Sequence, residues 1–337
     1  MEGLEMILEE DMEYITQTDL PWDDLEGANI LITGANGMLP SYMVDTLLYL
    51  NETRFKKKAT VFALVRNYEK ARARFIKSIA LNNLRFIVQD IREPITIFDK
   101  IDYVVHAAGL ASPKYYQTDP VGVMIPNTIG TYNCLEFSKK NPVKSFLFFS
   151  SGEVYGNIGG KIPEYLYGTI DPISSRACYA ESKRMGETMC MAYLKQYGIP
   201  TKIIRPFHTY GPHVNLDDGR IFADLINDVV NRRYIRLNSG GLANRTFCYL
   251  SDATIAFFTV LLKGQSGEAY NVGGFETSIL ELAETLAKEY GLMVLPGTSK
   301  SGYPRVLPDL TKIGELGWQP KISIEEGFRR TIRSFQE

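Results

Sequence analysis

The sequence has few residues suited to binding a metal and no strong excess of either charge. Its 337 residues include 3 histidines and 4 cysteines, and no C-x-x-C spacing occurs. We therefore expect no protein-bound catalytic metal, and we expect Cys134, Cys178, Cys190 and Cys248 to be reduced thiols of a cytoplasmic protein. A net charge of −2 argues against an extended nucleic-acid surface.

Long apolar stretches are also missing from the sequence. No run approaches the roughly 20 residues that cross a bilayer, and the acidic N-terminus has neither a basic start nor an apolar signal segment. A hydrophobic content of 45% instead fits a globular protein that contacts neither membranes nor nucleic acids.

From Asn29 onward the sequence contains short apolar runs separated by helical patterns. This alternation indicates βαβ units and an α/β fold with a doubly wound parallel sheet that is buried on both faces. The expected strands are Ile30–Thr33, Thr60–Val65, Leu84–Val88, Tyr103–Ala107, Ser145–Ser150 and Thr201–Pro206. Further helices are expected at Met6–Tyr14, Ser278–Tyr290 and Ile324–Phe335.

Three parts of the chain follow from this pattern. Residues 1–27 form an N-terminal extension, residues 28–206 carry the strand–helix alternation, and residues 207–337 form mainly a smaller α/β lobe. The lobe is expected to interleave with the first domain near Pro163–Ile173 and to bind substrate in a cleft between the two.

A glycine-containing turn follows the first expected strand, in Thr33-Gly34-Ala35-Asn36-Gly37-Met38-Leu39-Pro40. Two glycines there allow a tight turn and let a pyrophosphate approach the backbone N–H groups of the next helix. Where a third glycine would complete the pattern the chain has Pro40, which the first turn of a helix tolerates. We therefore expect a Rossmann-like domain whose first cofactor contacts are Gly34, Asn36, Gly37, Met38 and Leu39.

The choice of nicotinamide cofactor is open at Arg66, which stands at the end of the second strand where NAD sites usually have an acidic residue. Arg66 could pair with the 2′-phosphate of NADP, stack on adenine or face solvent. His106 is expected to be structural. The other expected cofactor contacts are Asp90 and Ile91 near the adenine, Ala107, Ala108 and Gly109 along the channel, and Pro206.

Catalytic chemistry is indicated by Tyr179 and Lys183, which lie one turn apart on a helical pattern that ends at Gly198. A lysine charge beside a phenol favours the phenolate, so that Tyr179 can remove a hydroxyl proton and both residues can face the nicotinamide. Ser151, at the end of the fifth strand, is expected beside the Tyr179 oxygen.

The chain resembles the extended short-chain dehydrogenases that act on nucleotide sugars, over almost its whole length from Asn29. Within that family it is most similar to the UDP-glucuronate decarboxylases. The segments that carry the resemblance are Ala111-Ser112-Pro113-Lys114-Tyr115-Tyr116, Asn127-Thr128-Ile129-Gly130-Thr131, Glu153-Val154-Tyr155-Gly156, Thr209-Tyr210-Gly211-Pro212, Asp217-Asp218-Gly219-Arg220 and Arg245-Thr246-Phe247-Cys248-Tyr249, with Pro308-Asp309-Leu310 and Leu316-Gly317-Trp318-Gln319-Pro320 near the C-terminus.

The resemblance implies bound NAD, or NADP if Arg66 pairs with a phosphate, and a transient 4-keto sugar. A 4,6-dehydratase of this family needs an acid where this chain has Gly152, whereas a 4-epimerase needs only the serine, tyrosine and lysine. A decarboxylase needs no such acid, and Glu153 could organise the water or the proton for its last step. The expected reaction is thus UDP-glucuronate decarboxylation, with epimerization and dehydration as alternatives.

Further implications of the resemblance concern the substrate and the assembly. Asn127 either resembles the asparagine of this family's catalytic-helix region, where it could contact substrate, or is a helix cap. His208 replaces an asparagine that contacts the substrate in this family. The helix of Tyr179 resembles one that forms a four-helix homodimer interface. The expected substrate-binding residues are Ser112, Asn127, His208, Arg220, Arg245 and Arg305.

Two other classes of protein compete with this interpretation. A non-catalytic NAD(P)-binding protein would have lost Ser151, Tyr179 or Lys183, yet all three are present. A reductase of small carbonyl compounds would suit an arginine at position 66 but not the segments of the nucleotide-sugar enzymes.

Overall fold

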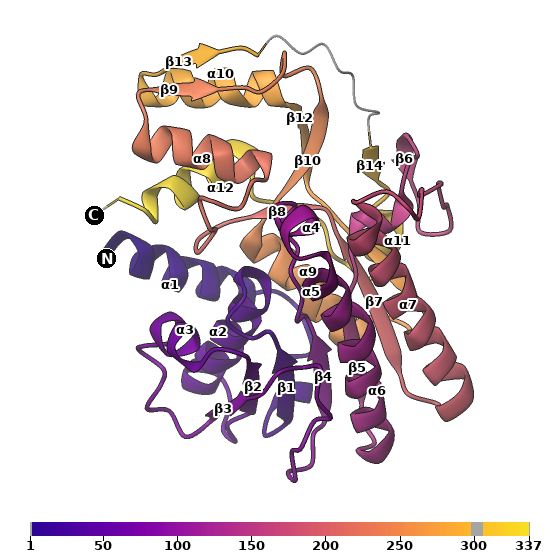
Figure 1. Ribbon diagram of the computed structural model, residues 1–337. Helices are drawn as coiled ribbons and strands as arrows, with labels where there is room; N and C mark the ends of the chain where they lie inside the picture. The colour runs from indigo at the N-terminus through magenta and orange to yellow at the C-terminus, as the bar shows by residue number, and fades with distance from the viewer. Residues whose placement is uncertain (1, 298–305, 337) are drawn as a thin grey trace.

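A seven-stranded parallel sheet forms the centre of the computed structural model, which describes residues 2–297 and 306–336 (Figure 1). The strand order is β3-β2-β1-β4-β5-β7-β11, with the order reversing direction between β1 and β4 as in a doubly wound fold. The strands are β1 Asn29–Thr33, β2 Thr60–Val65, β3 Leu84–Val88, β4 Tyr103–His106, β5 Ser145–Phe149, β7 Thr201–Pro206 and β11 Ala269–Val272.

The predicted α/β fold is confirmed, and the six expected strands are present within one residue at each end. The seventh strand, β11, was missed because it has four residues and follows a turn in the C-terminal part of the chain. It pairs with β7, so residues after position 206 complete the edge of the main sheet.

Helices cover both faces of this sheet (Figure 1). One face packs against α2 (Met38–Thr53) and α9 (Leu250–Lys263) in the largest apolar core. The other face packs against α6 (Thr131–Lys140) and α7 (Ala177–Tyr197). Because α9 belongs to the second half of the sequence, the two lobes share this core and interleave. The shorter helices are α3 Tyr68–Arg74, α4 Tyr115–Thr118, α5 Pro120–Ile125, α11 Thr311–Gly314, the π-helix η2 Pro126–Gly130, and the 3-10 helices η1 Trp22–Leu25 and η3 Gly152–Tyr155.

The smaller lobe has its own core around Phe222, Phe247 and Phe328. Its three-stranded sheet has the order β12-β10-β8, with β8 parallel and β12 antiparallel to β10. A short β6 near the predicted interleaving segment pairs with β14 from the C-terminal part. The elements are β6 Gly160–Ile162, β8 His208–Tyr210, α8 Ile221–Asn231, β9 Tyr234–Arg236, β10 Asn244–Tyr249, β12 Phe275–Ser278, α10 Ile279–Tyr290, β13 Met293–Leu295, β14 Val306–Pro308 and α12 Ile324–Arg333.

The N-terminal extension is a packed part of the molecule. Its helix α1 (Glu2–Thr16) is longer than the expected segment and contacts α2, α9 and α12. Met12, Ile15 and Trp22 belong to the largest core, because α1 and η1 cover α9 on the side away from the sheet. None of the helices in the described part of the chain is long and apolar enough to cross a membrane.

Candidate active site

The turn after β1 is shaped for close backbone approach. Gly34 has a φ of +65°, and a Cβ placed on it would lie 2.7 Å from Cα of Ala108, so glycine is required there. Gly37 caps α2, and Pro40 lies in the first turn of the helix as expected. The N–H groups of Met38 and Leu39 at this helix N-terminus, with Asn36 in the preceding turn, form the cradle that a pyrophosphate would need.

His106 holds the neighbouring loop in place rather than taking part in proton transfer. The Thr33 hydroxyl accepts the N–H groups of Ala107 and Ala108, both at 3.2 Å, and donates to Nδ1 of His106 at 2.8 Å. The other ring nitrogen then donates to the carbonyl of Pro126 at 3.1 Å. Burial lowers the pKa of His106 to about 3, so the ring is neutral and fixes the end of β4 beside the Gly34 turn.

The predicted adenine contacts lie at the ends of β2 and β3. Arg66 is exposed, while Ile91 is buried and its carbonyl accepts from Asn133 at 2.8 Å. Burial alone would raise the pKa of Asp90, but its ion pair with Arg92 and the charge of Arg66 outweigh burial. The net effect is a lowered pKa, so the carboxylate stays ionised. Gly109 lies beside Lys183, and Pro206, at the end of β7, completes the set.

The predicted catalytic residues meet where β5 ends and α7 begins. Lys183 is buried and its Nζ donates to the carbonyl of Phe149 at 2.6 Å, which fixes α7 against β5. Tyr179 is also buried, and its pKa is raised by burial but lowered by a hydrogen bond with Ser151 and by the charge of Arg220. Burial lowers the pKa of Lys183 to about 7, whereas the negative charge of Glu187 raises it.

A buried network that motif spacing does not reveal supports this centre. The Arg205 guanidinium pairs with both carboxylate oxygens of Glu187, at 2.8 and 2.7 Å, and Ser150 donates to the same carboxylate at 2.5 Å. Arg205 also donates to the hydroxyl of Tyr155 at 2.9 Å. Glu187 lies one turn after Lys183 on α7, so the network connects the catalytic helix to β5 and β7. The available sequence signals were the charged Arg205 inside the apolar run of β7 and Glu187 four residues after Lys183.

Tyr116 was missed as a neighbour of the catalytic tyrosine. Its ring stacks on the Tyr179 ring with centroids 5.2 Å apart and planes 17° apart. Burial raises the pKa of both Tyr116 and Tyr179, and the negative charge of Glu153 raises each of them further. Glu153 lies in the first turn of η3, the helix that Ser151 caps, and its side chain is exposed. The aromatic run Tyr115-Tyr116 was the available signal.

Three of the predicted substrate residues gather in the smaller lobe. His208 on β8 pairs with Phe247 of β10, the strand that carries Arg245. The residue is half-buried, its buried Nδ1 makes no hydrogen bond, and desolvation together with the charges of Arg245 and Arg220 lowers its pKa to about 4. A neutral imidazole beside two guanidinium groups can bind an anion by hydrogen bonds and charge.

The remaining predicted substrate residues have different positions. Ser112 is buried and donates to the carbonyl of Asp218 at 2.5 Å, in the loop before Arg220. Arg305 lies outside the described residues. Asn127 is fully buried inside η2, where it caps no helix, and its side-chain amide donates to Ser182 of α7 at 3.0 Å. It therefore contacts the helix of Tyr179, and its contact with substrate stays a prediction.

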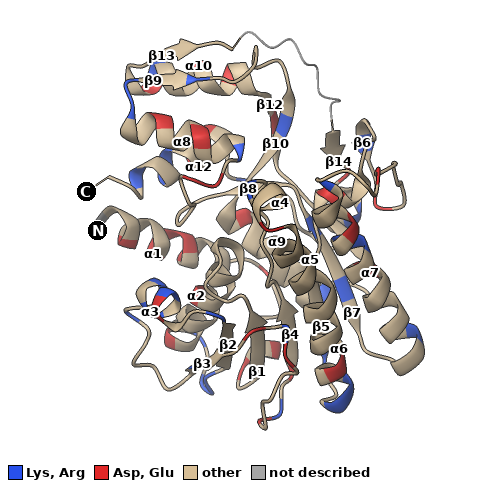
Figure 2. Cartoon of the chain, viewed as in Figure 1, with Lys and Arg blue, Asp and Glu red and all other residues tan. Residues whose placement is uncertain are grey.

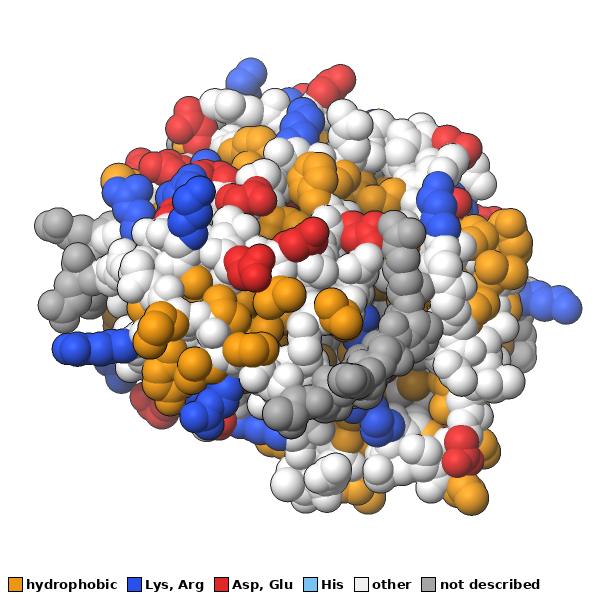
Figure 3. Space-filling view, turned by 90° about the horizontal axis from the view of Figure 1, so that it is seen from above, with side chains coloured by type: hydrophobic (Ala, Val, Ile, Leu, Met, Phe, Trp, Pro, Cys, Tyr) orange, Lys and Arg blue, Asp and Glu red, His pale blue; other side chains and the backbone are white. Residues whose placement is uncertain are grey.

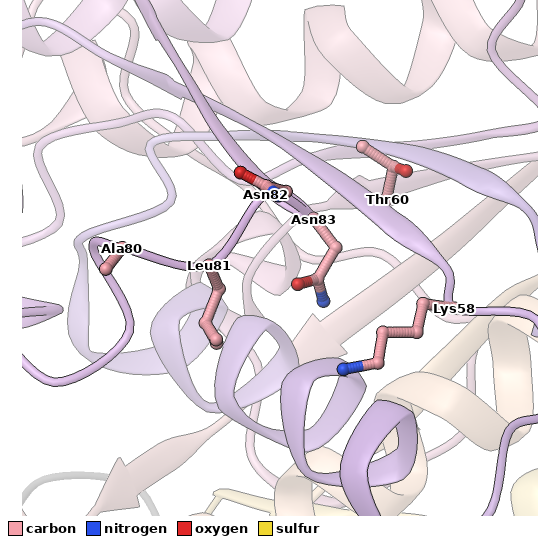
Figure 4. Close-up of a pocket in the computed structure, with 6 residues that line it drawn as sticks. All are labelled: Lys58, Thr60, Ala80, Leu81, Asn82 and Asn83. Carbon is pink, nitrogen blue, oxygen red and sulfur yellow. The ribbon is translucent and has the colours of Figure 1, made fainter.

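No group of three or more histidine, cysteine, aspartate or glutamate side chains is arranged to hold a metal among the residues described. On the face seen from above in Figure 3, basic and acidic side chains are interspersed, as the small net charge indicates. A separate hollow lined by Lys58, Thr60 and Asn83 lies where β2 and β3 begin, at the opposite end of the sheet from Tyr179 (Figure 4).

Known proteins share both the sequence and the fold. Residues 30–273 match the NAD dependent epimerase/dehydratase family. UDP-glucuronic acid decarboxylase 5 of Arabidopsis thaliana is 33% identical over 305 residues, which span 88% of this chain and 86% of that protein. UDP-glucuronic acid decarboxylase 1 of Xenopus tropicalis is 33% identical over 91% of this chain and 72% of its own.

Solved structures give the same result. The UDP-glucuronic acid 4-epimerase of Bacillus cereus in complex with UDP-glucuronic acid and NAD has a TM-score of 0.79 and 25% identity, over 91% of this chain and 99% of its own. The UDP-glucose 4-epimerase of Thermotoga maritima with UDP-glucose has a TM-score of 0.76 and 26% identity, over 91% and 98%. With its glycine turn, its Tyr179–Lys183 helix and these relatives, the chain belongs to the NAD-dependent epimerase/dehydratase family.

Proposed function

We propose that this protein decarboxylates a UDP-linked glucuronic acid through a 4-keto intermediate. The observation that carries the proposal is the buried Tyr179–Lys183 pair with Ser151 at the Tyr179 oxygen. Identity of 33% to the decarboxylases over most of both chains supports this substrate class.

The residues around the Gly34 turn fit NAD, since the close approach of Gly34 to Ala108 and the start of α2 provide a backbone cradle for the pyrophosphate. Gly34, Asn36, Gly37, Met38 and Leu39 would hold the phosphates. The contacts proposed along the rest of the cofactor are Arg66, Asp90 and Ile91 at the adenosine and Ala107, Ala108, Gly109, Lys183 and Pro206 toward the nicotinamide. NAD, when bound, accepts the C4 hydride of the sugar and returns it.

Tyr179 begins the reaction by taking the proton of the sugar 4-hydroxyl as the C4 hydride leaves. The hydrogen bond from Ser151 and the charge of Arg220 lower the pKa of Tyr179 and so favour the phenolate that this step needs. Lys183, one turn along α7 with its Nζ 5.8 Å from the centre of the Tyr179 ring, is proposed to add to this effect when it is charged. The ketone at C4 makes the C5 carboxylate a β-keto acid. Its C5–C6 bond breaks, carbon dioxide leaves, and the electron pair passes into a C4–C5 enolate.

Glu153 is our candidate for completing the reaction, because its side chain is exposed and its charge raises the pKa of both Tyr116 and Tyr179. We assign it the water or the proton that reaches C5. Hydride return to C4 and proton return from Tyr179 then give the pentose. Gly152 offers no acid to protonate a leaving 6-hydroxyl, so ordinary 4,6-dehydration is disfavoured.

A 4-epimerase is the second candidate, because the solved structure with a TM-score of 0.79 is a UDP-glucuronic acid 4-epimerase. Epimerization would use the same Tyr179, Lys183 and Ser151 but would keep the carboxylate. It would require the 4-ketone to turn over in the site, and Glu153 would have no chemical role.

The diphosphate of the substrate would lie against His208, Arg220 and Arg245, since the charges of both arginines act on the His208 imidazole and lower its pKa. One guanidinium group can donate two parallel hydrogen bonds to phosphate oxygens, and a neutral imidazole can donate one more. Ser112 would act through the Asp218 loop, and Arg305 stays a predicted contact.

We also propose a homodimer formed by α5, α6 and α7, which lie side by side in Figure 1. These helices expose Val121, Met124, Tyr132, Met185 and Met191. Exposed apolar side chains on neighbouring helices are typical of an interface. Light scattering tests the dimer, and Met185→Glu should give a monomer.

The four free thiols favour a cytoplasmic location.

Incubation with UDP-glucuronate, followed by mass spectrometry of the nucleotide products, tests the reaction. A product lighter by about 44 mass units, absent with Tyr179→Phe, is expected from loss of carbon dioxide. A product of unchanged mass with altered retention would establish the epimerase instead. Other UDP-, dTDP-, GDP- and CDP-sugars form the comparison panel, and a loss of about 18 mass units from one of them would contradict the role assigned to Gly152.

A further inference from the structure

A carboxylate in the N-terminal helix connects α2 and β10, which carry proposed site residues, with α12. Asp11 on α1 is fully buried. Its Oδ2 accepts hydrogen bonds from the hydroxyls of Tyr42, at 3.0 Å, and Tyr249, at 2.8 Å. Its Oδ1 accepts from the guanidinium of Arg330 at 3.1 Å.

Each partner of Asp11 comes from a different layer. Tyr42 belongs to α2, whose N-terminus forms the cofactor cradle. Tyr249 ends β10, and Arg245 lies four residues earlier, on the same face of that strand. Arg330 belongs to α12, which packs in the smaller lobe. A single oxygen therefore bridges the cofactor helix and the strand with a proposed substrate arginine.

A second contact of α1 also connects it to the segment that precedes α12. Tyr14 donates to Asp252 at 2.8 Å, and the other oxygen of Asp252 accepts the N–H groups of Lys321 and Ile322, both at 2.8 Å. These two residues lead into α12. Figures 1 and 2 show α1, rich in acidic residues, lying between α2 below and α12 above. The extension thus connects the two lobes at two points.

We propose that Asp11 is a positioning residue that sets the place of β10, and hence of Arg245 and the paired His208, relative to the cofactor helix. The substrate part of this inference rests on the proposed function. Asp11 and Arg330 lie outside the segment that matches the family, residues 30–273, whereas Tyr42 and Tyr249 lie inside it.

Because Asp11 is a buried charge, we expect its hydrogen bonds to fix the positions of its partners more than to increase the free energy of unfolding. A buried carboxylate carries a large desolvation penalty, and apolar residues of similar volume often pack with equal or greater stability. Hydrogen bonds to three elements, by contrast, impose fixed distances and directions. The groups that face Asp11 are Tyr42 from α2, Tyr249 from β10 and Arg330 from α12, whose guanidinium also pairs with Glu326 at 2.8 Å.

The test compares Asp11→Asn with Glu10→Gln in the full-length protein. Both variants remove one negative charge from α1, but Glu10 is exposed. Amide hydrogen exchange of residues 244–249 is the first readout, because it reports local opening without any substrate. We expect faster exchange in β10 for Asp11→Asn and wild-type exchange for Glu10→Gln.

Binding of UDP-glucose and of NAD, each measured by calorimetry, is the second readout. Asp11→Asn should weaken UDP-glucose about 10-fold, since displacement of a binding group by about an ångström has effects of this order or more. NAD affinity should change less than about 2-fold, because its proposed cradle belongs to the main sheet. Tyr249→Phe should weaken UDP-glucose similarly, and adding Asp11→Asn to it should have little further effect.

The outcomes separate the two proposals. Lower thermal stability of Asp11→Asn with unchanged exchange in β10 would make Asp11 merely structural and overturn the inference. A wild-type protein that binds no UDP-sugar, while β10 exchanges faster in Asp11→Asn, would refute the nucleotide-sugar function and leave the positioning role supported. If Asp11→Asn does not fold, the exchange of β10 in Tyr249→Phe decides in the same way.

Discussion

The ring of Phe207 lies directly over Gly152, so that a Cβ on Gly152 would come within 3.0 Å of three of its carbons. Phe207 also stacks on Tyr155, with centroids 6.1 Å apart, and belongs to the small apolar group that includes Val154 and Ile162. The Phe207 ring therefore occupies the space that a side chain at position 152 would need, at the start of η3 before Glu153. The residues at positions 152 and 207 thus constrain each other.

Gly152→Thr places a hydroxyl side chain against the Phe207 ring and should lower activity. The added atoms would force the Phe207 ring to move, and overpacking of this kind typically costs about 1–3 kcal/mol. We expect kcat/KM for UDP-glucuronate to fall about 10-fold. Adding Phe207→Leu should recover much of the loss, and full activity of the single variant would show that the ring yields freely.

Ser151→Ala should shift the pH dependence of the reaction upward. The hydrogen bond from Ser151 lowers the pKa of Tyr179, which burial raises. Without that bond the pKa rises further, so a higher pH is needed to form the phenolate. The acidic limb of the kcat profile should move to higher pH, with turnover at neutral pH reduced about 10- to 100-fold. An unchanged limb with lower turnover would separate Ser151 from the ionisation of Tyr179.

Binding of UDP-glucose should take up protons through His208. In the protein without substrate, burial and the charges of Arg245 and Arg220 lower the pKa of His208 to about 4. A diphosphate between the arginines would raise that pKa, so affinity should increase as the pH falls from 8 toward 5.

Calorimetry in buffers of different ionisation enthalpy measures this uptake directly. His208→Asn is the matched variant, since asparagine can donate a hydrogen bond but does not titrate. Its binding should be independent of pH in this range. Equal proton uptake by both proteins would assign the titration to another group.

The stability of the protein should fall as Asp11 ionises. Burial raises the pKa of Asp11 from 3.8 to about 6, although Tyr249, Arg330 and Tyr42 lower it in part. A raised carboxyl pKa contributes stability that is fully present below pH 4 and lost as the pH rises through 6. Relative to Asp11→Asn, the wild type should therefore lose about 2–3 kcal/mol of unfolding free energy over this range. Urea unfolding at pH 4, 5, 6 and 7 measures the difference, and a constant difference would contradict the prediction.

Local patterns were enough to determine the main sheet and the catalytic pair. Buried parallel strands are short apolar runs, so the six predicted strands appear almost at their predicted bounds. The turn at Gly34 and the one-turn spacing of Tyr179 and Lys183 are equally local, because each depends on a single loop or helix. The family resemblance followed from segments of this kind and is confirmed.

Tertiary structure alone decided which distant residues meet. Asn127 proved to be buried against Ser182, Arg205 to pair with Glu187, and β11 to complete the sheet. Asp11 and Tyr249 are 238 positions apart, yet they share one hydrogen bond. No periodicity encodes such a contact, because it depends on how helices and strands from both lobes pack, and that packing is fixed by apolar burial over the whole chain.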